Sequence, residues 1–546
     1  MGVSSASGKP ARSKTTRRVS WTMLLSILAS ASILVVHQFF TSFHLRSGSI
    51  EADRDALGYL PPTDESNKEA TGKNGGYPKP NNVLLTSEKL TNPTREDEPP
   101  MASTAEKPNP PLNILILYPD DWRHDTLGGV APVVQTPYLN RLAEQGIRFT
   151  HNMVTTSICW ISRATLFTGM YAARHKSYRL RQPEFYKSWH NMTWPSLLRE
   201  AGYFVGHIGK WQFYNPNKTV ESFFHFAKIF EGQHQYNVRT AAERARDLFD
   251  KFLVQKPDNM PFAATIAFYP PKAIGQSKVP GAQYRPKPEF RQKYYFNVTV
   301  PYPPYDINAS YHKLPWFFHT FGNDARRRWE ERYGTTLQYQ ESMKNYYSLV
   351  TEVDEACREI VENLKRRNLL NNTMIIFTTD NGLFHAAHGL AGKWYPYQES
   401  IRVPLIVSDP RMTSKYFGTT DDSLTLNIDL ASTILGAAGI KAPDRMQGRD
   451  ISELYLDDKE DFVAQKPWRN DFYYEFPLDN GNWMPQSNAL VRRDYKYIYW
   501  PTFQHEEIFN LTEDPYELTN QVNHSNYQEL LVEMRERYSM LQAEAE

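Results

Sequence analysis

The sequence predicts an α/β fold in which helices flank a mostly parallel central sheet, with a smaller α+β subdomain at the C-terminal end of the chain. Two observations carry this prediction. Short apolar runs, typical of strands buried on both faces, alternate with amphipathic helical patterns from residue 112 onward. Toward the C-terminus the pattern changes to short aromatic segments. Alternating strands and helices indicate strand–helix–strand units, whose strands pair in parallel.

The predicted elements can be placed in order along the chain. The first strand, at residues 113–118, contains the run Ile-Leu-Ile-Leu and is ended by Pro119. Further strands are expected at residues 262–268, 374–377 and 496–500, and helices at residues 137–145, 239–253 and 341–367. We therefore expect a main domain at residues 112–455 and a C-terminal subdomain at residues 456–546.

The composition excludes several classes of protein. The 546 residues carry a net charge of +1, so no global field recruits nucleic acid. Two cysteines, Cys159 and Cys357, exclude a disulfide framework and a cysteine-rich zinc site but leave room for one disulfide between them. Cys357 falls inside the long predicted helix, where we expect it to pack against the core.

An uncharged run at residues 21–40 predicts a transmembrane signal anchor. Its length matches a bilayer core of roughly 30 Å. Arg17 and Arg18 precede it, so the positive-inside tendency keeps residues 1–20 in the cytoplasm and sends the rest of the chain into the lumen. The competing interpretation is a cleavable signal peptide, which residues 29–32 disfavour because these small residues lie inside the apolar run. We therefore expect a single-pass, type II membrane protein.

The segment at residues 41–111 is rich in Pro, Asn, Glu, Lys and Ser. It has too little apolar periodicity to build a core, and we expect a flexible stem. All glycosylation sequons lie beyond the predicted anchor, at Asn191, Asn217, Asn297, Asn308, Asn371, Asn510 and Asn523. Their position agrees with a lumenal or extracellular body made in the secretory pathway.

Two pairs of oxygen-bearing side chains follow two of the predicted strands. Asp120 and Asp121 follow the first predicted strand, and Asp380 and Asn381 follow the predicted strand at residues 374–377. Ligands gather at the carboxyl ends of parallel strands, and these oxygen ligands suit a hard cation such as calcium. Neither pair contains Cys or His, which disfavours zinc. One such pair alone is more often a turn or a helix cap, but two pairs favour a metal site.

A cysteine segment occupies residues 159–169 and reads Cys-Trp-Ile-Ser-Arg-Ala-Thr-Leu-Phe-Thr-Gly. A single cysteine is usually a small buried hydrophobic residue. Here, however, Cys159 stands before Ser162, Arg163 and a predicted helix. A helix N-terminus with a guanidinium nearby suits an anionic group.

This segment resembles the signature of the sulfatase family, within the alkaline-phosphatase-like superfamily. The signature is Cys or Ser, any residue, Pro or Ala, Ser, Arg, two variable residues, two apolar residues, Thr and Gly. The chain departs from it only at Ile161. The resemblance implies that a formylglycine-generating enzyme converts Cys159 to formylglycine (3-oxoalanine).

Other motifs extend the resemblance over residues 112–523. They are similar to the family's first metal loop, its Gly-Lys-Trp motif, its second metal loop with the residues that follow it, and its closing elements. The matching residues are Asp120, Asp121, Arg123, Asp125, Leu127 and Gly128; Gly209, Lys210 and Trp211; Asp380, Asn381, Gly382, His388, Gly389, Gly392 and Lys393; Arg402, Val403 and Pro404; and residues 427–439 and 508–520.

The resemblance implies a calcium site and a set of catalytic residues. The implied calcium ligands are Asp120, Asp121, Asp380, Asn381 and the residue formed from Cys159. The implied catalytic residues are Cys159, Arg163, Lys210, Lys272, His388 and Lys393. Two histidines that are common in the family are replaced here by Gln212 and Lys272. Proton transfer is therefore arranged differently, with Lys272, His388 or His207 as the candidate donor to the leaving oxygen.

The implied mechanism is hydrolysis of a sulfate ester. A hydroxyl of the hydrated formylglycine attacks sulfur while calcium withdraws charge from the sulfate oxygens. Arg163, Lys210 and Lys393 hold the sulfate in line.

We therefore expect a sulfatase that acts on a sulfated carbohydrate, because the predicted enzyme is lumenal and carries an aromatic-rich insertion at residues 275–335. The aromatic residues of this insertion either line a sugar-binding rim or, more commonly in such loops, pack among themselves; they are Tyr302, Tyr305, Tyr311, Trp316, Phe317 and Phe318. One alternative function is a phosphodiesterase or phosphonate hydrolase of the same superfamily, against which Cys159 argues. The other is a tethered, non-catalytic protein that binds sulfated glycans, which Ile161, Gln212 and Lys272 would favour.

Overall fold

The computed structural model describes the chain from residue 111 to the C-terminus, except for a few short segments. The described ranges are 111–179, 189–213, 220, 222–230, 241–275, 277–320, 322–456 and 467–546. Within these ranges, no helix combines the length and the apolar character that a membrane crossing requires. The predicted anchor at residues 21–40 and the predicted stem at residues 41–111 lie outside the described residues, apart from Pro111.

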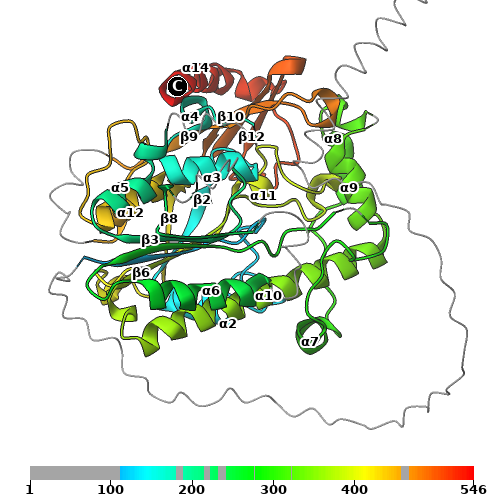
Figure 1. The fold of residues 1–546 in the computed structure, drawn as a ribbon. Coiled ribbons are helices and arrows are strands. Elements are labelled where there is room, and N and C mark those ends of the chain that lie inside the picture. Colours follow the sequence, from blue (N-terminus) through cyan, green and yellow to red (C-terminus); the bar gives the residue numbers. More distant parts are fainter. Residues whose placement is uncertain are drawn as a thin grey trace, which may run out of the picture. The chain divides into compact units, whose positions relative to one another are not determined.

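A mostly parallel sheet forms the centre of the main domain, as the sequence predicts (Figure 1). Its strands are β1 (Asn113–Leu117), β2 (Ile147–Met153), β3 (Phe204–Gly209), β4 (Phe226–Ile229), β5 (Phe262–Ala267), β6 (Thr373–Thr378), β7 (Leu405–Ser408) and β8 (Thr419–Leu426). They are hydrogen-bonded in the order β4-β3-β5-β1-β6-β7-β2-β8. Neighbours pair in parallel except where β7 runs against β6 and β2.

Helices cover both faces of this sheet (Figure 1). One face carries α2 (Pro137–Glu144), α6 (Ala241–Gln255) and α10 (Thr336–Arg366), and the other carries α3 (Cys159–Thr168), α5 (Trp194–Glu200) and α12 (Asp429–Ala437). Alternate residues of β1 enter the two resulting cores: Leu115 and Leu117 belong to one, and Ile114 and Ile116 to the other. A strand that is buried on both faces has no polar alternation, which is why the run reads as continuously apolar.

The long helix α10 begins at Thr336, five residues before the predicted start at residue 341. The predicted start was wrong because the capping residue Thr335 was overlooked. The hydroxyl of Thr335 accepts a hydrogen bond from the Gln338 amide at 3.2 Å and caps the first turn. Thr followed three residues later by Gln is a capping signal that the sequence contained. Cys357 lies on the core side of α10, fully buried and unbridged.

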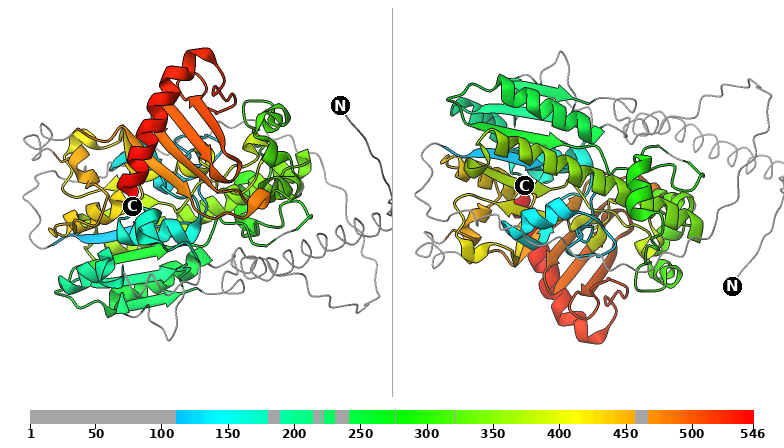
Figure 2. Two further views of the ribbon diagram at one scale, coloured as in Figure 1. Left: turned by 90° about the horizontal axis from the view of Figure 1, so that it is seen from above. Right: turned by 90° about the horizontal axis from the view of Figure 1, so that it is seen from below.

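The C-terminal segment forms a separate small sheet. It is antiparallel, in the order β12-β11-β10-β9, with β9 (Asp471–Phe476), β10 (Ser487–Arg492), β11 (Tyr495–Trp500) and β12 (His505–Asn510). The final helix, α14 (Gln528–Ala545), packs along one face of it (Figure 2). Tyr473, Leu490 and Tyr497 of the sheet share a core with Leu531 and Met534 of the helix.

Glu475 of β9 makes the stability of this sheet depend on pH. Its side chain is 5% exposed, and its Oε1 accepts a hydrogen bond from the Ala173 amide at 2.6 Å. Burial raises the pKa of Glu475 to about 7. The folded state therefore holds a proton that the unfolded state releases, and this stabilisation is lost as pH rises from the ordinary glutamate pKa to about 7.

We expect a Glu475→Gln variant to lose this pH dependence. The free energy of unfolding of the parent should fall by up to about 1.4 kcal/mol for each pH unit between roughly pH 5 and pH 7 because of this carboxyl. The amide of the variant has no proton to release, so its stability relative to the parent should increase with pH. Urea unfolding at about pH 5 and about pH 7.5 measures the difference. Identical pH profiles for the two proteins would contradict the assignment.

Candidate active site

The predicted site residues meet because they follow neighbouring strands of one sheet. Asp120 and Asp121 follow β1, Asp380 follows β6, Lys210 follows β3 and Lys272 follows β5. These strands are adjacent, in the order β3-β5-β1-β6, and parallel, so their carboxyl ends share one edge. Ligand sites of α/β sheets form at this edge.

Two glycines allow the chain to turn sharply at this edge. Gly209 has a φ of 108°, and a Cβ there would lie 2.0 Å from the carbonyl oxygen of Ala267. Gly382 allows a similar approach, since its Cβ would lie 2.1 Å from the carbonyl oxygen of Glu399. Glycine is therefore required directly before Lys210 and directly after Asn381.

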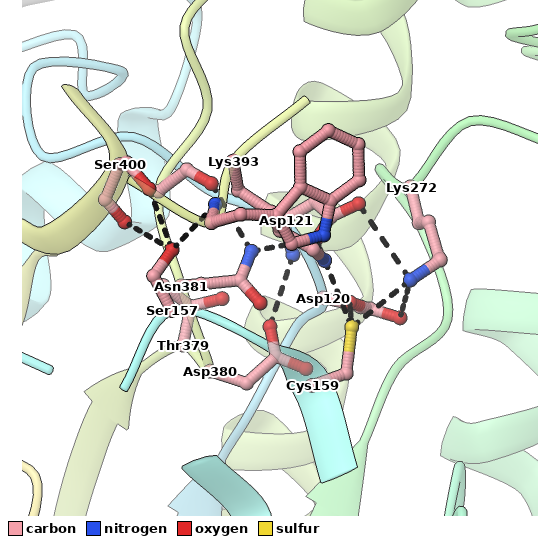
Figure 3. A network of polar contacts seen from close by, with 12 residues as sticks. Asp120, Asp121, Ser157, Cys159, Lys272, Thr379, Asp380, Asn381, Lys393 and Ser400 are labelled. Carbon is pink, nitrogen blue, oxygen red and sulfur yellow. Dashed lines mark hydrogen bonds and ion pairs between the residues drawn. The ribbon is translucent and has the colours of Figure 1, made fainter. Parts of the chain in front are cut away.

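Three carboxylates and the cysteine form a compact buried cluster (Figure 3). Ligand atoms of Asp120, Asp121, Cys159 and Asp380 all lie within 4.8 Å of one another. Asn381 adjoins them, because its Nδ2 donates to Asp121 Oδ1 at 2.6 Å. Its Oδ1 is buried and has no hydrogen-bond partner among the described residues. A buried amide oxygen beside three carboxylates is a donor set that fits a hard divalent cation.

Cationic side chains surround the same cluster. Arg163 donates to Asp380 Oδ2 from Nε at 3.1 Å and from Nη2 at 2.8 Å. Lys210 pairs with Asp120, and Lys393 with Asp121. Burial alone would raise the pKa of Asp380, but Arg163, Lys210 and Lys393 lower it to about 2. The carboxylates therefore stay charged at any physiological pH.

The described site has more cationic than anionic side chains. Three carboxylates, of Asp120, Asp121 and Asp380, face four cations, of Arg163, Lys210, Lys272 and Lys393. A bound metal ion would add to this excess. An anion such as a sulfate group is therefore the charge type that this edge of the sheet attracts.

Cys159 lies between two of these lysines at the first position of α3 (Figure 3). Its Sγ accepts from Lys393 Nζ at 2.8 Å and from Lys272 Nζ at 3.0 Å. Asp120 Oδ1 lies 3.5 Å from the same sulfur. The side chain of Lys272 is 19% exposed, whereas that of Lys210 is 1% exposed, so Lys272 borders the solvent side of the site. Any group formed at residue 159 would be held by both ammonium groups.

The two histidines predicted as proton donors lie apart from this network. The Nε2 of His388 lies 3.5 Å from Glu399 Oε2, and its ring packs at a tilt against Tyr397, with 4.9 Å between the centroids. The Nε2 of His207 lies 3.1 Å from the carbonyl oxygen of Lys210, and burial lowers the pKa of His207 to about 3. In the described part of the chain, neither ring forms a hydrogen bond with Cys159, so a catalytic role for His388 stays a prediction.

The loop that carries Lys393 is held by residues to which the sequence analysis gave no role in the site. We define residues 393–398 as the lysine loop. The C-terminal sheet contributes Tyr474, whose hydroxyl donates to the Trp394 carbonyl at 2.6 Å, and Lys496, whose Nζ donates to the Pro396 carbonyl at 2.7 Å. Glu517, after β12, accepts from the Gln398 amide at 2.7 Å.

The main domain holds the beginning of the same loop. The Trp394 amide donates to Ser157 Oγ at 3.3 Å, and Ser157 Oγ lies 2.6 Å from Ser400 Oγ (Figure 3). Ser157 is two residues before Cys159, so one short segment positions both the cysteine and the lysine loop. Closeness to Cys159 in the sequence was the only signal that could have indicated Ser157, and Tyr474, Lys496 and Glu517 had no such signal.

Comparison with known families decides what this geometry belongs to. The sulfatase family matches residues 112–440, which contain every residue of the cluster described above. The chain belongs to the sulfatase family. It is a sulfuric ester hydrolase. A second family match, to the C-terminal part of N-sulphoglucosamine sulphohydrolase, covers residues 386–544.

Individual sulfatases resemble this one over most of its length. The N-acetylglucosamine-6-O-sulfatase of Bacteroides thetaiotaomicron is 24% identical over 491 residues, covering 76% of this chain and 83% of the relative. The human N-acetylglucosamine-6-sulfatase is 23% identical over 501 residues, covering 79% of this chain and 84% of the relative. A solved structure in complex with its substrate D-glucosamine-2-N,6-O-disulfate superposes with a TM-score of 0.68 at 21% identity, covering 80% of this chain and 98% of that chain.

Proposed function

We propose that this sulfatase removes sulfate from a sulfated carbohydrate, using formylglycine made from Cys159 and a calcium ion held by Asp120, Asp121, Asp380 and Asn381. One observation carries the proposal: Cys159 lies at a helix N-terminus between two lysines, beside a buried cluster of hard oxygen ligands. Two of the relatives are named as N-acetylglucosamine sulfatases, which supports a carbohydrate sulfate as the substrate.

The absent groups would supply two parts of the chemistry. Calcium would withdraw charge from the sulfate oxygens, and formylglycine would supply a hydroxyl nucleophile that is renewed after each turnover. The oxygens of Asp120, Asp121 and Asp380, with the unpartnered Asn381 Oδ1, are the ligands that the chain offers the cation.

The cationic residues would bind the sulfate and orient the nucleophile. Lys393 and Lys272 contact the Cys159 sulfur from the segments after β6 and β5, and they would hold a hydroxyl at that position and a sulfate oxygen beside it. Arg163 and Lys210 are fixed by Asp380 and Asp120, so their positive charges need no rearrangement when the sulfate arrives. Preorganised charge of this kind is worth several kcal/mol in a site that excludes water.

Lys272 is the residue that would protonate the leaving oxygen. Burial lowers the pKa of Lys272, but the carboxylates of Asp120 and Asp121 raise it well above its ordinary value, so its Nζ holds a proton. It is also the more exposed of the two lysines on the sulfur, on the side from which a large substrate would approach. In this proposal, Lys272 Nζ donates the proton that the leaving oxygen takes.

Mass spectrometry and turnover measurements together test the proposed function. The protein, made in a eukaryotic secretory host, should carry an aldehyde or its hydrate at residue 159 and should hydrolyse an aryl sulfate and N-acetylglucosamine 6-O-sulfate. Cleavage of a phosphodiester without any sulfatase activity would favour a phosphodiesterase or phosphonate hydrolase. An unmodified Cys159 without turnover, together with binding of sulfated glycans, would favour the non-catalytic alternative.

We also propose that residues 21–40 anchor the enzyme in the membrane as a type II protein, with residues 41–111 as a stem and residues 112–455 and 456–546 as lumenal domains. The uncharged run after Arg17 and Arg18 supports this proposal. We expect the full chain to resist alkaline carbonate extraction and to shift in size on glycosidase treatment. A fully extracted, unglycosylated protein would contradict both the anchor and its orientation.

A further inference from the structure

The aromatic-rich insertion between β5 and α10 contains three exposed aromatic side chains, Phe296, Tyr302 and Trp316, of which Trp316 is the most exposed. Phe317 and Phe318 are fully buried, and Tyr311 is nearly so, which confirms packing as their role. Trp316, in contrast, is 60% exposed. It begins the short helix η7 (Trp316–His319), which follows α8 (Ile307–Lys313). A tryptophan that is exposed to this extent presents an apolar ring face that a ligand could contact.

The side chain of Trp316 packs against the rings of Phe317 and Phe503. Phe317 stacks on Phe503 with a centroid distance of 4.2 Å and an interplanar angle of 11°, and it also contacts Trp500 at 5.1 Å. Trp316 meets the edge of Phe503 at 5.4 Å. The exposed indole is thus seated on two elements from distant parts of the sequence, the insertion and the segment after β11. A supported aromatic side chain can stack on a ligand without a large loss of conformational entropy.

One stretch of the insertion, residues 307–319, contains no Asp or Glu. Its exposed polar side chains are Asn308, His312, Lys313 and His319. Of these, Lys313 carries a formal positive charge at pH 7. The rings of His312 and His319 lie parallel, 6.1 Å apart. We call Trp316, His312, Lys313 and His319 the Trp316 surface.

This surface adjoins the loop that carries the active-site lysine. The helix α8 packs on η9 (Ala387–Gly389) so closely that a Cβ on Gly389 would lie 2.8 Å from the Cβ of Tyr311. Phe318 meets Tyr395, in the lysine loop, edge-on at 4.8 Å. Arg326 of α9 (Asp324–Arg332) lies over the ring of Tyr311 in α8, 4.0 Å from its centroid. The insertion therefore packs against η9 and against the lysine loop.

We propose that the Trp316 surface binds a second part of the same sulfated carbohydrate chain whose ester sulfate lies at residue 159. Trp316 would stack on a sugar ring, and Lys313, with His312 and His319, would contact a neighbouring sulfate. The inference rests on the proposed function, and it narrows the substrate class to an anionic oligosaccharide longer than a single sugar. Charge complementarity favours this occupant, because an exposed tryptophan beside a lysine and two histidines suits an anionic ligand that also has apolar ring faces.

The test uses dextran sulfate as the long anionic probe and a small aryl sulfate as the reporter substrate. In the parent enzyme, dextran sulfate should inhibit hydrolysis of the aryl sulfate. In Trp316→Ala and Lys313→Ala variants, the dextran sulfate concentration that halves the rate should rise about tenfold, while KM and kcat for the aryl sulfate stay unchanged. The matched control is Phe296→Ala, since Phe296 is an aromatic residue of the same insertion that is 58% exposed. This control should be inhibited like the parent.

Direct binding separates failure of the inference from failure of the proposed function. The dissociation constant of fluorescently labelled dextran sulfate, measured by anisotropy, should rise about tenfold in the Trp316 and Lys313 variants even in protein that turns over no sulfate ester. Equal affinity and equal inhibition for the parent, both variants and the control would overturn the inference. If the parent hydrolyses no sulfate ester but the two variants bind dextran sulfate more weakly than the parent does, the result would support the Trp316 surface and refute the enzymatic function.

Discussion

A Cys159→Ala variant is expected to lose sulfate ester hydrolysis completely while keeping its fold. The alanine methyl group leaves no atom that could become a nucleophile, so the loss is chemical. The side chain is small and makes contacts mainly with Lys393 and Lys272, both of which keep carboxylate partners when the sulfur is gone. Thermal unfolding should therefore change little, and an aryl sulfate assay should show no turnover.

A Cys159→Ser variant distinguishes the formylglycine mechanism from its alternative. The serine hydroxyl can take up the sulfuryl group, but it has no second hydroxyl from which a proton could be lost to expel sulfate. We expect at most one turnover, and mass spectrometry should find sulfate on the introduced serine. Steady turnover of the aryl sulfate by this variant would refute the formylglycine mechanism. Steady cleavage of a phosphodiester would favour a hydrolase that uses an oxygen nucleophile.

The second large effect is expected from Asp380→Asn. Asp380 is fully buried, accepts two hydrogen bonds from Arg163 and accepts a third from the Asp121 amide at 3.2 Å. The amide keeps the size of the side chain but removes the charge that a calcium ion needs and that balances the Arg163 guanidinium. We expect activity to fall by about a thousandfold or more and calcium content, measured by atomic emission, to fall with it.

A control variant is needed because removing one partner of a buried ion pair also lowers stability. Asp409→Asn is matched to Asp380→Asn: Asp409 is buried, pairs with Arg411 at 2.6 Å and accepts from the Tyr455 hydroxyl at 3.0 Å, outside the site. We expect this variant to be less stable than the parent but to retain calcium and turnover. Retention of calcium and full activity in Asp380→Asn would mean that the metal site has been placed wrongly.

The sequence predicted for a physical reason that two acidic pairs would meet. Asp120, Asp121, Asp380 and Asn381 follow two predicted strands, and parallel strands bring their carboxyl ends to one edge. Lys210 and Lys272 were predicted only through the resemblance to the sulfatase family. Strands β1, β5, β6 and β11 and helices α2, α6 and α10 were predicted from continuous apolar runs and helical periodicity, which depend on local sequence alone. Strands β2, β3, β4, β7 and β8 of the central sheet were not predicted. The start of α10 was missed because its first turn is polar, although Thr335 marked it.

Other parts of the site could not be predicted from the sequence. His388 lies inside a motif of the family, yet the pattern gave no indication that its ring would face Glu399. The contact between Lys496 and the Pro396 carbonyl joins two residues whose pairing depends on how the small sheet docks on the main domain. Docking of this kind is decided by tertiary packing, which leaves no periodic pattern in either segment. The exposure of Trp316 was hidden for the same reason, since Phe317 and Phe318 beside it are buried.

The contacts that hold the lysine loop bear on how much of the chain constitutes a working unit. Every side chain of the carboxylate and lysine cluster precedes residue 400, but Tyr474, Lys496 and Glu517 come from the last part of the chain. A partly synthesised chain that ends at residue 455 therefore contains every side chain of the cluster but lacks the residues that hold Lys393 in place. A premature stop codon before Glu517 would act as an active-site lesion, and a fragment cut at the boundary between the two sheets would be a poor choice for expression or engineering.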